Sequence, residues 1–525
     1  MIADAASRLA SVTLVGLPDE GLTAAFRREF QARPYAGVLL FRRHFRTATA
    51  LPGLIAELRA LAAPRRILVA VDEEGGFVSQ LAPDFPVPPN ARVLGRAASV
   101  TEVERIAATV GTWLSALGVD VNFAPSLDVD SESANPVIGP RSFGSDPARV
   151  IQLGTAALRG YREGGVLSTV KHFPGHGATS YDSHLTLPDC EADEATLMAR
   201  DVAPFRELLH LAPLVMTAHV RYAALDPGWP ATLSPRIVTG LLRGTLDGRG
   251  VVVTDAMEMA GVADEAPGGA SLLLALAAGC DLLLLGAWNA RVTEQFAQAA
   301  RRWEHEGESI LPLARWEAAR GAIEALYAAS IASERADHGE HGEPADRANL
   351  SLLVPPSWDP MLLSICRRSL SWDGPPTPPA HERLEVLEPA WSAGPSIAEL
   401  LLEAGVPSRG RAFRQAAPGA APGRTPDVTP DFASALPIGA AGGGGTNASD
   451  PLVVALPRRT QLLPDEAHAL HALCGARPVL LVALEQDSFL GDFPEAAGRL
   501  SACDATPAMR RAIALEIAEI LSKVS

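Results

Sequence analysis

Residues 165–177 read GVLSTVKHFPGHG, and this stretch indicates how the first half of the chain folds. Its opening apolar run is typical of a buried strand, and the run delivers Lys171 and His172 at its end. Proline and glycine then break the strand into a loop that carries His176, Asp182 and His184. Three imidazoles, an ammonium and a carboxylate within fourteen positions exceed what a connecting loop needs, so the stretch predicts a functional site at a strand end.

Eight apolar runs of this kind, the quoted one included, alternate with helix-like segments over the first 330 residues. They occupy residues 11–17, 37–41, 66–71, 119–123, 166–170, 214–217, 250–254 and 281–285. Residues 101–117 have apolar side chains at helical spacing, with Thr101 as the expected N-cap, and residues 147–161 are a second expected helix. Runs buried on both faces are typical of parallel strands. Eight of them predict an α/β fold, a (β/α)8 barrel of the TIM type.

Polar side chains stand where these runs end, which supports the barrel. They are Asp72, Asp128, Lys171, His172, His219 and Asp255. One such residue could simply cap a loop, but six residues from five strands indicate more. The carboxyl ends of barrel strands converge on one mouth, where active sites form.

The barrel pattern fades after Tyr327, and a polar, charged segment at 333–349 is the expected linker. We therefore expect a barrel domain at 1–332 and a smaller α/β domain at 350–525. Short apolar runs at 384–387, 452–456 and 479–484 predict strands in that second domain, and residues 397–404 and 509–521 predict helices. Residues 410–447 are rich in Pro, Gly and Ala, as expected of a flexible excursion.

Composition and charge exclude several classes of partner. The net charge of −16 argues against nucleic acid or an anionic membrane, whereas a small neutral substrate is compatible with it. The five cysteines are scattered and form no CxxC pair, so neither a disulfide framework nor a cysteine zinc site is indicated. Asp4 and Arg8 interrupt the N-terminus where a secretory signal has an apolar core, and no apolar run is long enough to span a membrane. We expect a cytoplasmic protein.

The strand-end carboxylate Asp255 must be paired, hydrogen-bonded or reactive. In glycoside hydrolysis such a group can attack the anomeric carbon while a second group protonates the leaving oxygen. Histidine can be that second group, because its ordinary pKa lies near neutrality. Asp182, two residues before His184, could fix the tautomer of that imidazole.

At this point the sequence resembles a family. KHFPGHG at 171–177, DSH at 182–184 and VTDAM at 253–257 are similar to the signatures of family 3 glycoside hydrolases. They resemble in particular the bacterial β-N-acetylglucosaminidases that recycle cell-wall fragments. The resemblance extends to residues 37–41, 72–76, 122–128 and 138–143, and the order of barrel, linker and smaller domain is similar to that of the two-domain members.

The resemblance implies roles for single residues. Asp255 would be the nucleophile, and His184 the acid/base with Asp182 as its partner. The residues that would hold the sugar hydroxyls are Asp72, Arg141, Lys171 and His172. His176 would shape the loop, and His219 would lie at the edge of the pocket. No cofactor or metal is implied.

Three positions depart from the family pattern. Phe77 and Gln80 stand where arginines are usual, the second of which touches substrate, and Glu73 stands where glutamine is common. Gln80 is thus a further possible contact to substrate. These differences leave the catalytic set intact and affect the contacts to the substrate.

The activity expected is a retaining exo-β-N-acetylglucosaminidase that releases GlcNAc from GlcNAc-β-1,4-(anhydro)MurNAc fragments. Three alternatives remain. A metal-dependent amidohydrolase would need a His-x-His at an early strand end, and residues 11–17 contain no histidine. A non-catalytic sugar sensor would not need Asp182, His184 and Asp255 together. A β-glucosidase of the same family usually lacks the DSH loop.

Overall fold

The computed structural model describes residues 4–132, 135–179 and 187–338 and, with gaps, parts of the chain between 354 and 524. The chain divides into two compact units. The barrel unit comprises Met1–Phe85 and Ala98–Pro355, and the C-terminal unit comprises Pro86–Ala97 and Pro356–Ser525.

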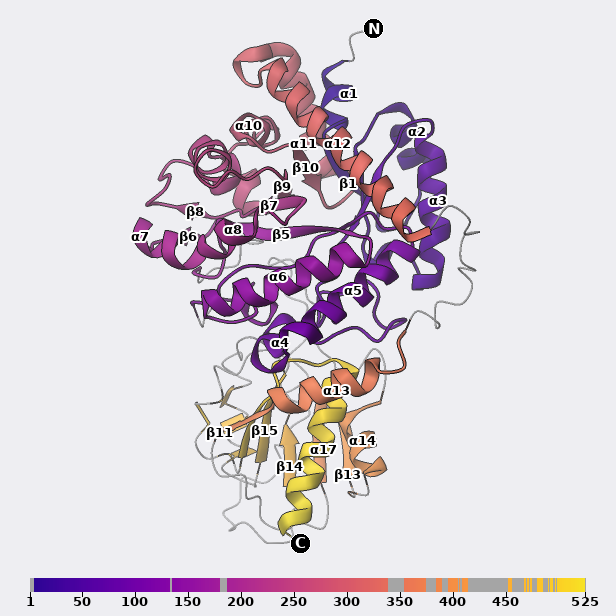
Figure 1. The fold of residues 1–525 in the computed structure, drawn as a ribbon, viewed down its shortest axis with the longest axis vertical. Helices are drawn as coiled ribbons and strands as arrows, with labels where there is room; N and C mark the ends of the chain where they lie inside the picture. Colours follow the sequence, from indigo (N-terminus) through magenta and orange to yellow (C-terminus); the bar gives the residue numbers. More distant parts are fainter. Residues whose placement is uncertain are drawn as a thin grey trace. The chain divides into compact units, whose positions relative to one another are not determined.

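The barrel unit (Figure 1) contains a closed ring of parallel strands, as the apolar runs predict, and their order is β1-β10-β9-β7-β5-β4-β3-β2. The strands are β1 (Thr13–Gly16), β2 (Gly37–Leu39), β3 (Leu68–Val71), β4 (Val121–Asn122), β5 (Leu167–Phe173), β7 (Leu214–Thr217), β9 (Val251–Ala256) and β10 (Leu282–Leu285). The ring closes where β1 pairs with β10, Thr13 opposite Leu283, and with β2, Leu14 opposite Gly37. The strands are buried on both faces, which explains their lack of apolar–polar alternation.

Three candidate site residues lie inside strands where the sequence placed them just beyond. Strand β5 continues to Phe173, which pairs with Thr217, so Lys171 and His172 belong to the strand. Strand β9 likewise includes Asp255. The polar side chains do not end these strands, because the backbone groups of a residue can pair with a neighbouring strand whether its side chain is polar or apolar.

Helices cover the barrel. They are α1 (Ala5–Ala10), α2 (Ala24–Ala32), α3 (Leu51–Ala62), α5 (Val100–Ala116), α6 (Pro147–Glu163), α7 (Glu194–Thr196), α8 (Ala203–Leu208), α9 (Ala260–Ala263), α10 (Ala270–Ala278), α11 (Ala290–Glu306) and α12 (Leu313–His338). Helices α5 and α6 lie side by side (Figure 1), and a Cβ on Gly160 of α6 would come within 2.3 Å of the Glu104 carbonyl oxygen of α5. This close approach requires glycine.

The expected N-cap Thr101 is wrong. Helix α5 begins at Val100, and the Ser99 side chain accepts a hydrogen bond from Glu102 N while the Glu102 carboxylate accepts one from Ser99 N. This reciprocal capping box satisfies two backbone donors, whereas Thr101, two residues further on, already lies inside the helix.

The C-terminal unit is an α/β sheet with the strand order β11-β16-β15-β14-β12-β13. Its strands are β11 (Ser371–Asp373), β12 (Leu384–Pro389), β13 (Ser408–Phe413), β14 (Leu452–Ala455), β15 (Val479–Ala483) and β16 (Gly498–Ser501); only the β11–β16 pair, among these described strands, is antiparallel. Its helices include α13 (Trp358–Ser369), α14 (Ile397–Glu403) and α17 (Pro507–Val524).

Helix α4 (Ala91–Ala97) belongs to the C-terminal unit although its sequence lies between two barrel strands. Asn90 N donates to the Asp504 carboxylate at 2.7 Å, and Arg96 donates to Ser501 Oγ at 2.8 Å. Asn90 Oδ1 in turn accepts from Val93 N and starts the helix. These bonds explain why residues so distant in sequence form one unit.

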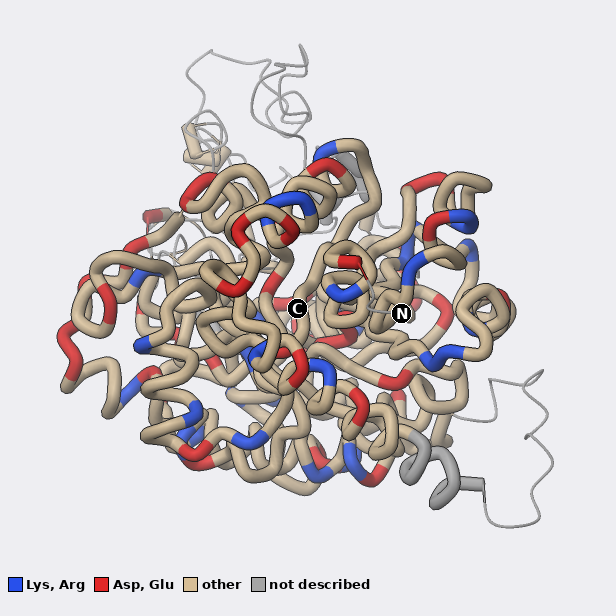
Figure 2. Tube along the Cα trace, turned by 90° about the horizontal axis from the view of Figure 1, so that it is seen from above, with Lys and Arg blue, Asp and Glu red and all other residues tan. Residues whose placement is uncertain are grey.

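Two expected segments are described only in part. Helix α12 continues to His338, into the expected linker, and the linker residues 339–349 lie outside the described part. Of the expected excursion at 410–447, residues 414–447 also lie outside it. Across the described helices, none combines the length and apolar character needed to cross a bilayer. Acidic and basic residues are interspersed along the chain (Figure 2).

Candidate active site

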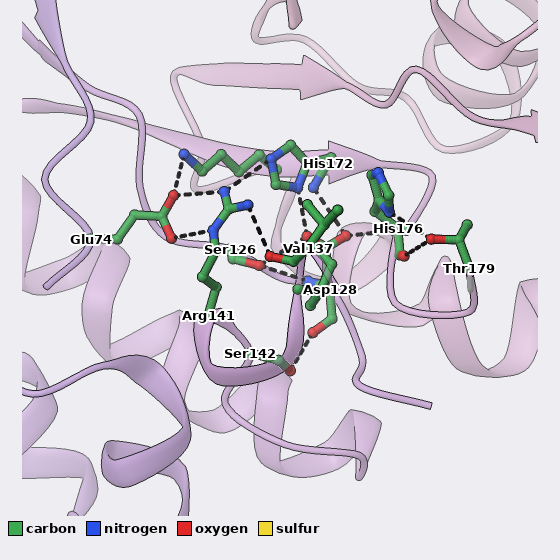
Figure 3. A network of polar contacts seen from close by, with 12 residues as sticks. Glu74, Ser126, Asp128, Val137, Arg141, Ser142, His172, His176 and Thr179 are labelled. Atoms are coloured by element: carbon green, nitrogen blue, oxygen red, sulfur yellow. Dashed lines mark hydrogen bonds and ion pairs between the residues drawn. The ribbon is translucent and has the colours of Figure 1, made fainter. Parts of the chain in front are cut away.

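The barrel mouth holds an ion-pair lattice of Asp72 and Glu74 from the loop after β3, Arg141 from the connection after β4, and Lys171 from β5. Lys171, on β5, places Nζ 2.7 Å from Asp72 Oδ1 and 2.6 Å from Glu74 Oε1, both in the loop after β3. Arg141 forms a bidentate ion pair with the same Glu74, with Nε 2.9 Å from Oε2 and Nη2 2.8 Å from Oε1. Figure 3 shows the Glu74 carboxylate facing the Arg141 guanidinium. The lattice preorganises two cations around one carboxylate.

Burial and the neighbouring charges shift the pKa values of the lattice residues in opposite directions. Burial by itself raises the pKa of Glu74, but the charges and hydrogen bonds of Arg141 and Lys171 outweigh it and lower that pKa to about 2. For Lys171 and Arg141, burial opposes the charged form, and the neighbouring carboxylates raise both pKa values. All three groups therefore stay ionised near neutrality.

Asp72 is the open member of the lattice. Its side chain is 21% exposed, against 2% for Lys171 and 8% for Glu74. A ligand that enters the mouth therefore meets the Asp72 carboxylate, while Glu74 holds the cations from behind. The sequence indicated Asp72, Arg141 and Lys171 as site residues, and the structure brings them together around Glu74, which the sequence did not single out.

A second buried carboxylate, Asp128, organises the histidines of the KHFPGHG stretch. Asp128 Oδ2 lies 2.6 Å from His172 Nδ1, and Oδ1 accepts from His176 N at 2.6 Å and from His172 N at 3.2 Å. Burial would raise the pKa of Asp128, but the histidines outweigh it and hold the pKa well below its usual range. Figure 3 shows Asp128 among these partners. Asp128 thus fixes the strand end and the turn after it.

The partners of His172 define its tautomer. Its Nε2 lies 3.3 Å from Arg141 Nη2, and a guanidinium can only donate. Nε2 therefore accepts, and the ring proton lies on Nδ1, where it is donated to Asp128. This places His172 against the lattice with one fixed orientation.

His176 lies deeper and shapes the loop. Its Nδ1 is 3.0 Å from Thr179 Oγ1, and its carbonyl oxygen accepts from Asn135 Nδ2 at 2.9 Å. Burial and the neighbouring His172 lower the pKa of His176 to about 4, so the ring is neutral near neutrality. A Cβ on Gly177, the next residue, would lie 1.7 Å from the Val129 carbonyl oxygen, so only glycine permits this packing.

Asp255 ends strand β9 at the same mouth. Its side chain is partly exposed, and Oδ1 accepts a hydrogen bond from Ala256 N at 2.7 Å. Three residues on, Glu258 Oε2 accepts from Gly286 N at 3.1 Å. Burial raises the pKa of Glu258 to about 7, and the charge of Asp255 contributes in the same direction.

The expected acid/base pair, Asp182 and His184, lies outside the described residues, which stop at Thr179 and resume at Leu187. Both predictions therefore stay predictions. His219 is buried at the end of β7, and its Nε2 lies 3.1 Å from the Ala256 carbonyl oxygen.

The three positions that depart from the family pattern lie in the loop after β3. Gln80 donates from Nε2 to the Asp72 carbonyl oxygen at 3.1 Å and accepts from Arg42 N at 2.7 Å, so its amide is engaged with backbone. Glu73 Oε2 accepts from Gln80 N and Leu81 N, and burial raises the pKa of Glu73 to about 7. Phe77 is 37% exposed, which is unusual for a large apolar side chain.

Within the described residues, no group of three His, Cys, Asp or Glu side chains is arranged to hold a metal ion. The polar groups at the mouth instead pair with one another and with backbone. A parallel barrel with convergent, preorganised polar groups at the carboxyl ends of its strands defines a TIM-barrel enzyme.

Comparison with known proteins identifies the family. The model of the glycosyl hydrolase family 3 N terminal domain matches residues 15–310. A beta-hexosaminidase of Chromobacterium violaceum is 40% identical over 279 residues, 52% of this chain and 77% of that protein. A beta-hexosaminidase of Idiomarina loihiensis is 34% identical over 277 residues, 52% of this chain and 82% of that protein. The chain belongs to glycosyl hydrolase family 3, and the resemblance seen in its motifs is confirmed.

The likeness to a solved structure extends beyond the barrel. A glycoside hydrolase family 3 beta-N-acetylglucosaminidase from Paenibacillus sp. str. FPU-7 has a TM-score of 0.83 and 27% identity, and the match covers 98% of this chain and 96% of that chain. The expected fold class, a barrel with a second α/β part, is therefore confirmed.

Proposed function

We propose that the protein is a retaining exo-β-N-acetylglucosaminidase that releases GlcNAc from β-1,4-linked cell-wall fragments. The observation that carries the proposal is the lattice of Asp72, Lys171, Glu74 and Arg141 at the same mouth as Asp255. Family membership and relatives named beta-hexosaminidase support the sugar specificity.

In this proposal the lattice binds the sugar in the −1 pocket. The exposed Asp72 carboxylate accepts hydrogen bonds from adjacent sugar hydroxyls, while Lys171, Arg141 and the His172 ring flank it as polar contacts. Because Glu74 and Asp128 already fix these side chains, little rotamer freedom is lost when the sugar binds. Such preorganisation favours the transition state over a loosely held substrate.

Asp255 then acts as the nucleophile. The hydrogen bond from Ala256 N to Oδ1 favours the ionised carboxylate, which must attack the anomeric carbon to form a glycosyl–aspartate ester. His184, with Asp182 behind it, protonates the departing oxygen and then deprotonates the water that cleaves the ester. This pair is carried over from the family motif.

The substrate we propose is a GlcNAc-β-1,4-(anhydro)MurNAc fragment, with or without peptide, met in the cytoplasm. All five cysteines are buried free thiols, which suits a reducing compartment. No cofactor or metal takes part in the proposed steps.

The test is aglycone release from an aryl β-N-acetylglucosaminide, with an aryl β-glucoside alongside and a chelator in parallel. We expect chelator-resistant turnover of the N-acetyl substrate, lowered by a factor on the order of 10⁴ or more in Asp255→Asn. His184→Ala should retain activity mainly on aryl substrates with good leaving groups, because these need little protonation.

A matched control removes the same charge elsewhere. Asp247 pairs with Arg249 at an exposed site before β9, and its backbone is left-handed (φ 54°), which asparagine tolerates. Asp247→Asn should behave as wild type. Preference for the glucoside would favour a β-glucosidase, loss of activity with chelator a metal hydrolase, and GlcNAc binding without turnover a sensor.

A further inference from the structure

A buried histidine behind the nucleophile has no place in the proposed chemical steps. His219, at the end of β7, is 1% exposed. Its Nε2 lies 3.1 Å from the Ala256 carbonyl oxygen, and its Nδ1 lies 2.8 Å from Thr232 Oγ1. Ala256 directly follows Asp255, so His219 contacts the backbone next to the proposed nucleophile.

The direction of the bond to Ala256 follows from its partners. A carbonyl oxygen can only accept, so Nε2 carries a proton and donates it. The Thr232 hydroxyl also lies 3.0 Å from the Ala218 carbonyl oxygen and 2.9 Å from Thr217 Oγ1. Whichever acceptor takes the Thr232 proton, Nε2 keeps its own. The bond from His219 to Ala256 is thus maintained in either protonation pattern of the ring.

Ala256 transmits this constraint to Asp255. Its N–H donates to Asp255 Oδ1 at 2.7 Å, while its carbonyl oxygen accepts from His219 and from Met259 N at 3.0 Å. The residue is therefore held on both sides. The carbonyl lies in the peptide unit shared with Met257 and the N–H in the unit shared with Asp255. Loss of the His219 bond leaves the Met259 contact in place and removes one of the restraints on the Ala256 backbone.

We propose that His219, supported by Thr232, is a positioning residue that restrains the Ala256 backbone between its two peptide units, so that the Ala256 N–H stays directed at the Asp255 carboxylate. The inference rests on the proposed nucleophilic role of Asp255. One oxygen of the carboxylate is tied to Ala256 N, and the other is then directed toward the anomeric carbon. Fixing this geometry matters because a displacement of about 1 Å can cost about a hundredfold in rate.

Other titratable groups also face Asp255. Its charge acts on Glu258, which follows on the same strand end, and on His176 in the loop after β5. Neither group changes in the variants below. Because His219 is itself titratable, only a shift that also occurs in Thr232→Val, where the ring stays in place, reports the Ala256 amide.

The test compares four variants: His219→Ala, His219→Gln, Thr232→Val and Ser234→Ala. Glutamine can place an amide N–H near the position of Nε2 and is the rescue variant. Thr232→Val keeps the volume and removes the hydroxyl that orients the ring. Ser234 lies in the same connection and donates to Asp226 Oδ2 at 2.6 Å, away from Ala256, so Ser234→Ala controls for a general loss of stability.

Two readouts are measured on the full chain. The first is the pH profile of kcat/KM with an aryl β-N-acetylglucosaminide. The second is covalent labelling by a 5-fluoro glycosyl fluoride of GlcNAc, for which both the labelled residue and the rate of trapping are determined. We expect His219→Ala to lower kcat/KM by about 10- to 100-fold. The acid limb of its kcat/KM profile should move up by about 0.5–1 pH unit, because the ionised carboxylate loses a stabilising hydrogen bond. His219→Gln should recover most of both effects, and Thr232→Val should show a smaller shift in the same direction.

The outcomes separate this inference from the proposed function. Suppose that the fluoro sugar labels Asp255 in wild type, but His219→Ala and Thr232→Val both keep the wild-type acid limb and trapping rate. That result would overturn the positioning role alone. A Ser234→Ala profile that shifts like His219→Ala would also overturn it, since stability would then be the cause. Label on a residue other than Asp255 would overturn the nucleophile assignment itself.

Discussion

Replacing Glu74 with glutamine tests whether the ion-pair lattice depends on its buried carboxylate. Glutamine preserves the shape but offers one acceptor oxygen to donors from both Arg141 and Lys171. In wild type the pKa of Glu74 is lowered from 4.5 to about 2. That difference corresponds to about 3 kcal/mol of stability near pH 7. Removing one partner of a buried ion pair typically costs about 3–5 kcal/mol, which agrees.

The pH dependence gives the prediction its sign. A carboxyl group whose pKa is lowered in the folded state contributes stability above pH 4.5, and the contribution is lost as the pH falls toward 2. The difference between wild type and Glu74→Gln should therefore be about 3 kcal/mol at pH 7 and about 2 kcal/mol at pH 3.5. Urea unfolding of the barrel, followed by tryptophan fluorescence at several pH values, measures it.

An exposed ion pair supplies the control. Glu57 pairs with Arg27 at the surface, with side chains 44% and 36% exposed, and Glu57→Gln should change stability by less than about 0.5 kcal/mol at any pH. If Glu74→Gln loses no more stability than Glu57→Gln, or if its loss does not shrink in acid, the lattice does not depend on that carboxylate and the reasoning is refuted.

Three further predictions concern residues around the lattice. Asp128→Asn should destabilise the barrel by about 1.5–3 kcal/mol in urea unfolding and lower kcat/KM, because the His172 ring and the backbone N–H groups of His172 and His176 lose a charged acceptor; unchanged unfolding would contradict this. The pKa of Glu73 is raised to about 7, so stability in wild type should fall as the pH rises from 4.5 toward 7, and Glu73→Gln should flatten this slope in thermal unfolding at several pH values. Gln80→Ala should raise KM and lower the free energy of unfolding by about 1–2 kcal/mol, because the Asp72 carbonyl oxygen loses its hydrogen bond from Gln80. An unchanged KM would show that the loop keeps its conformation without Gln80.

The barrel could be predicted from sequence because its strands are short apolar runs whose ends carry polar residues. The capping of α5 was missed although its signal is present, since Ser99 and Glu102 have capping-box spacing. Helix α4 could not be assigned to the C-terminal unit, because the bonds that place it there involve residues about 400 positions away, such as Asp504. Periodicity reports which face of an element is buried and is silent on its distant partner.

The candidate site was predicted where its residues stand at the ends of apolar runs and was missed at Glu74, which stands within the loop after β3. Asp72, Lys171 and Asp255 were found because they follow or end apolar runs. Glu74, two residues after Asp72, has the same charge and equally polar neighbours, so the sequence cannot say which of the two carboxylates faces the mouth. Asp128 was noted as a strand-end residue, but its contact with His172 depends on the pairing of β4 with β5.

The exposure of the two carboxylates assigns them different tasks. A single carboxylate that both held Lys171 and Arg141 and bound sugar hydroxyls would have to release the cations, at least in part, whenever it bound substrate. In this barrel Glu74 pairs with Arg141 in a bidentate contact and also contacts Lys171. Asp72 contacts Lys171 alone among these cations, and its side chain is the more exposed of the two carboxylates. Binding can then change the partners of Asp72 without disturbing the charges behind it. An Asp72→Asn variant should consequently lose sugar affinity while the barrel keeps most of its stability, whereas Glu74→Gln should lose both.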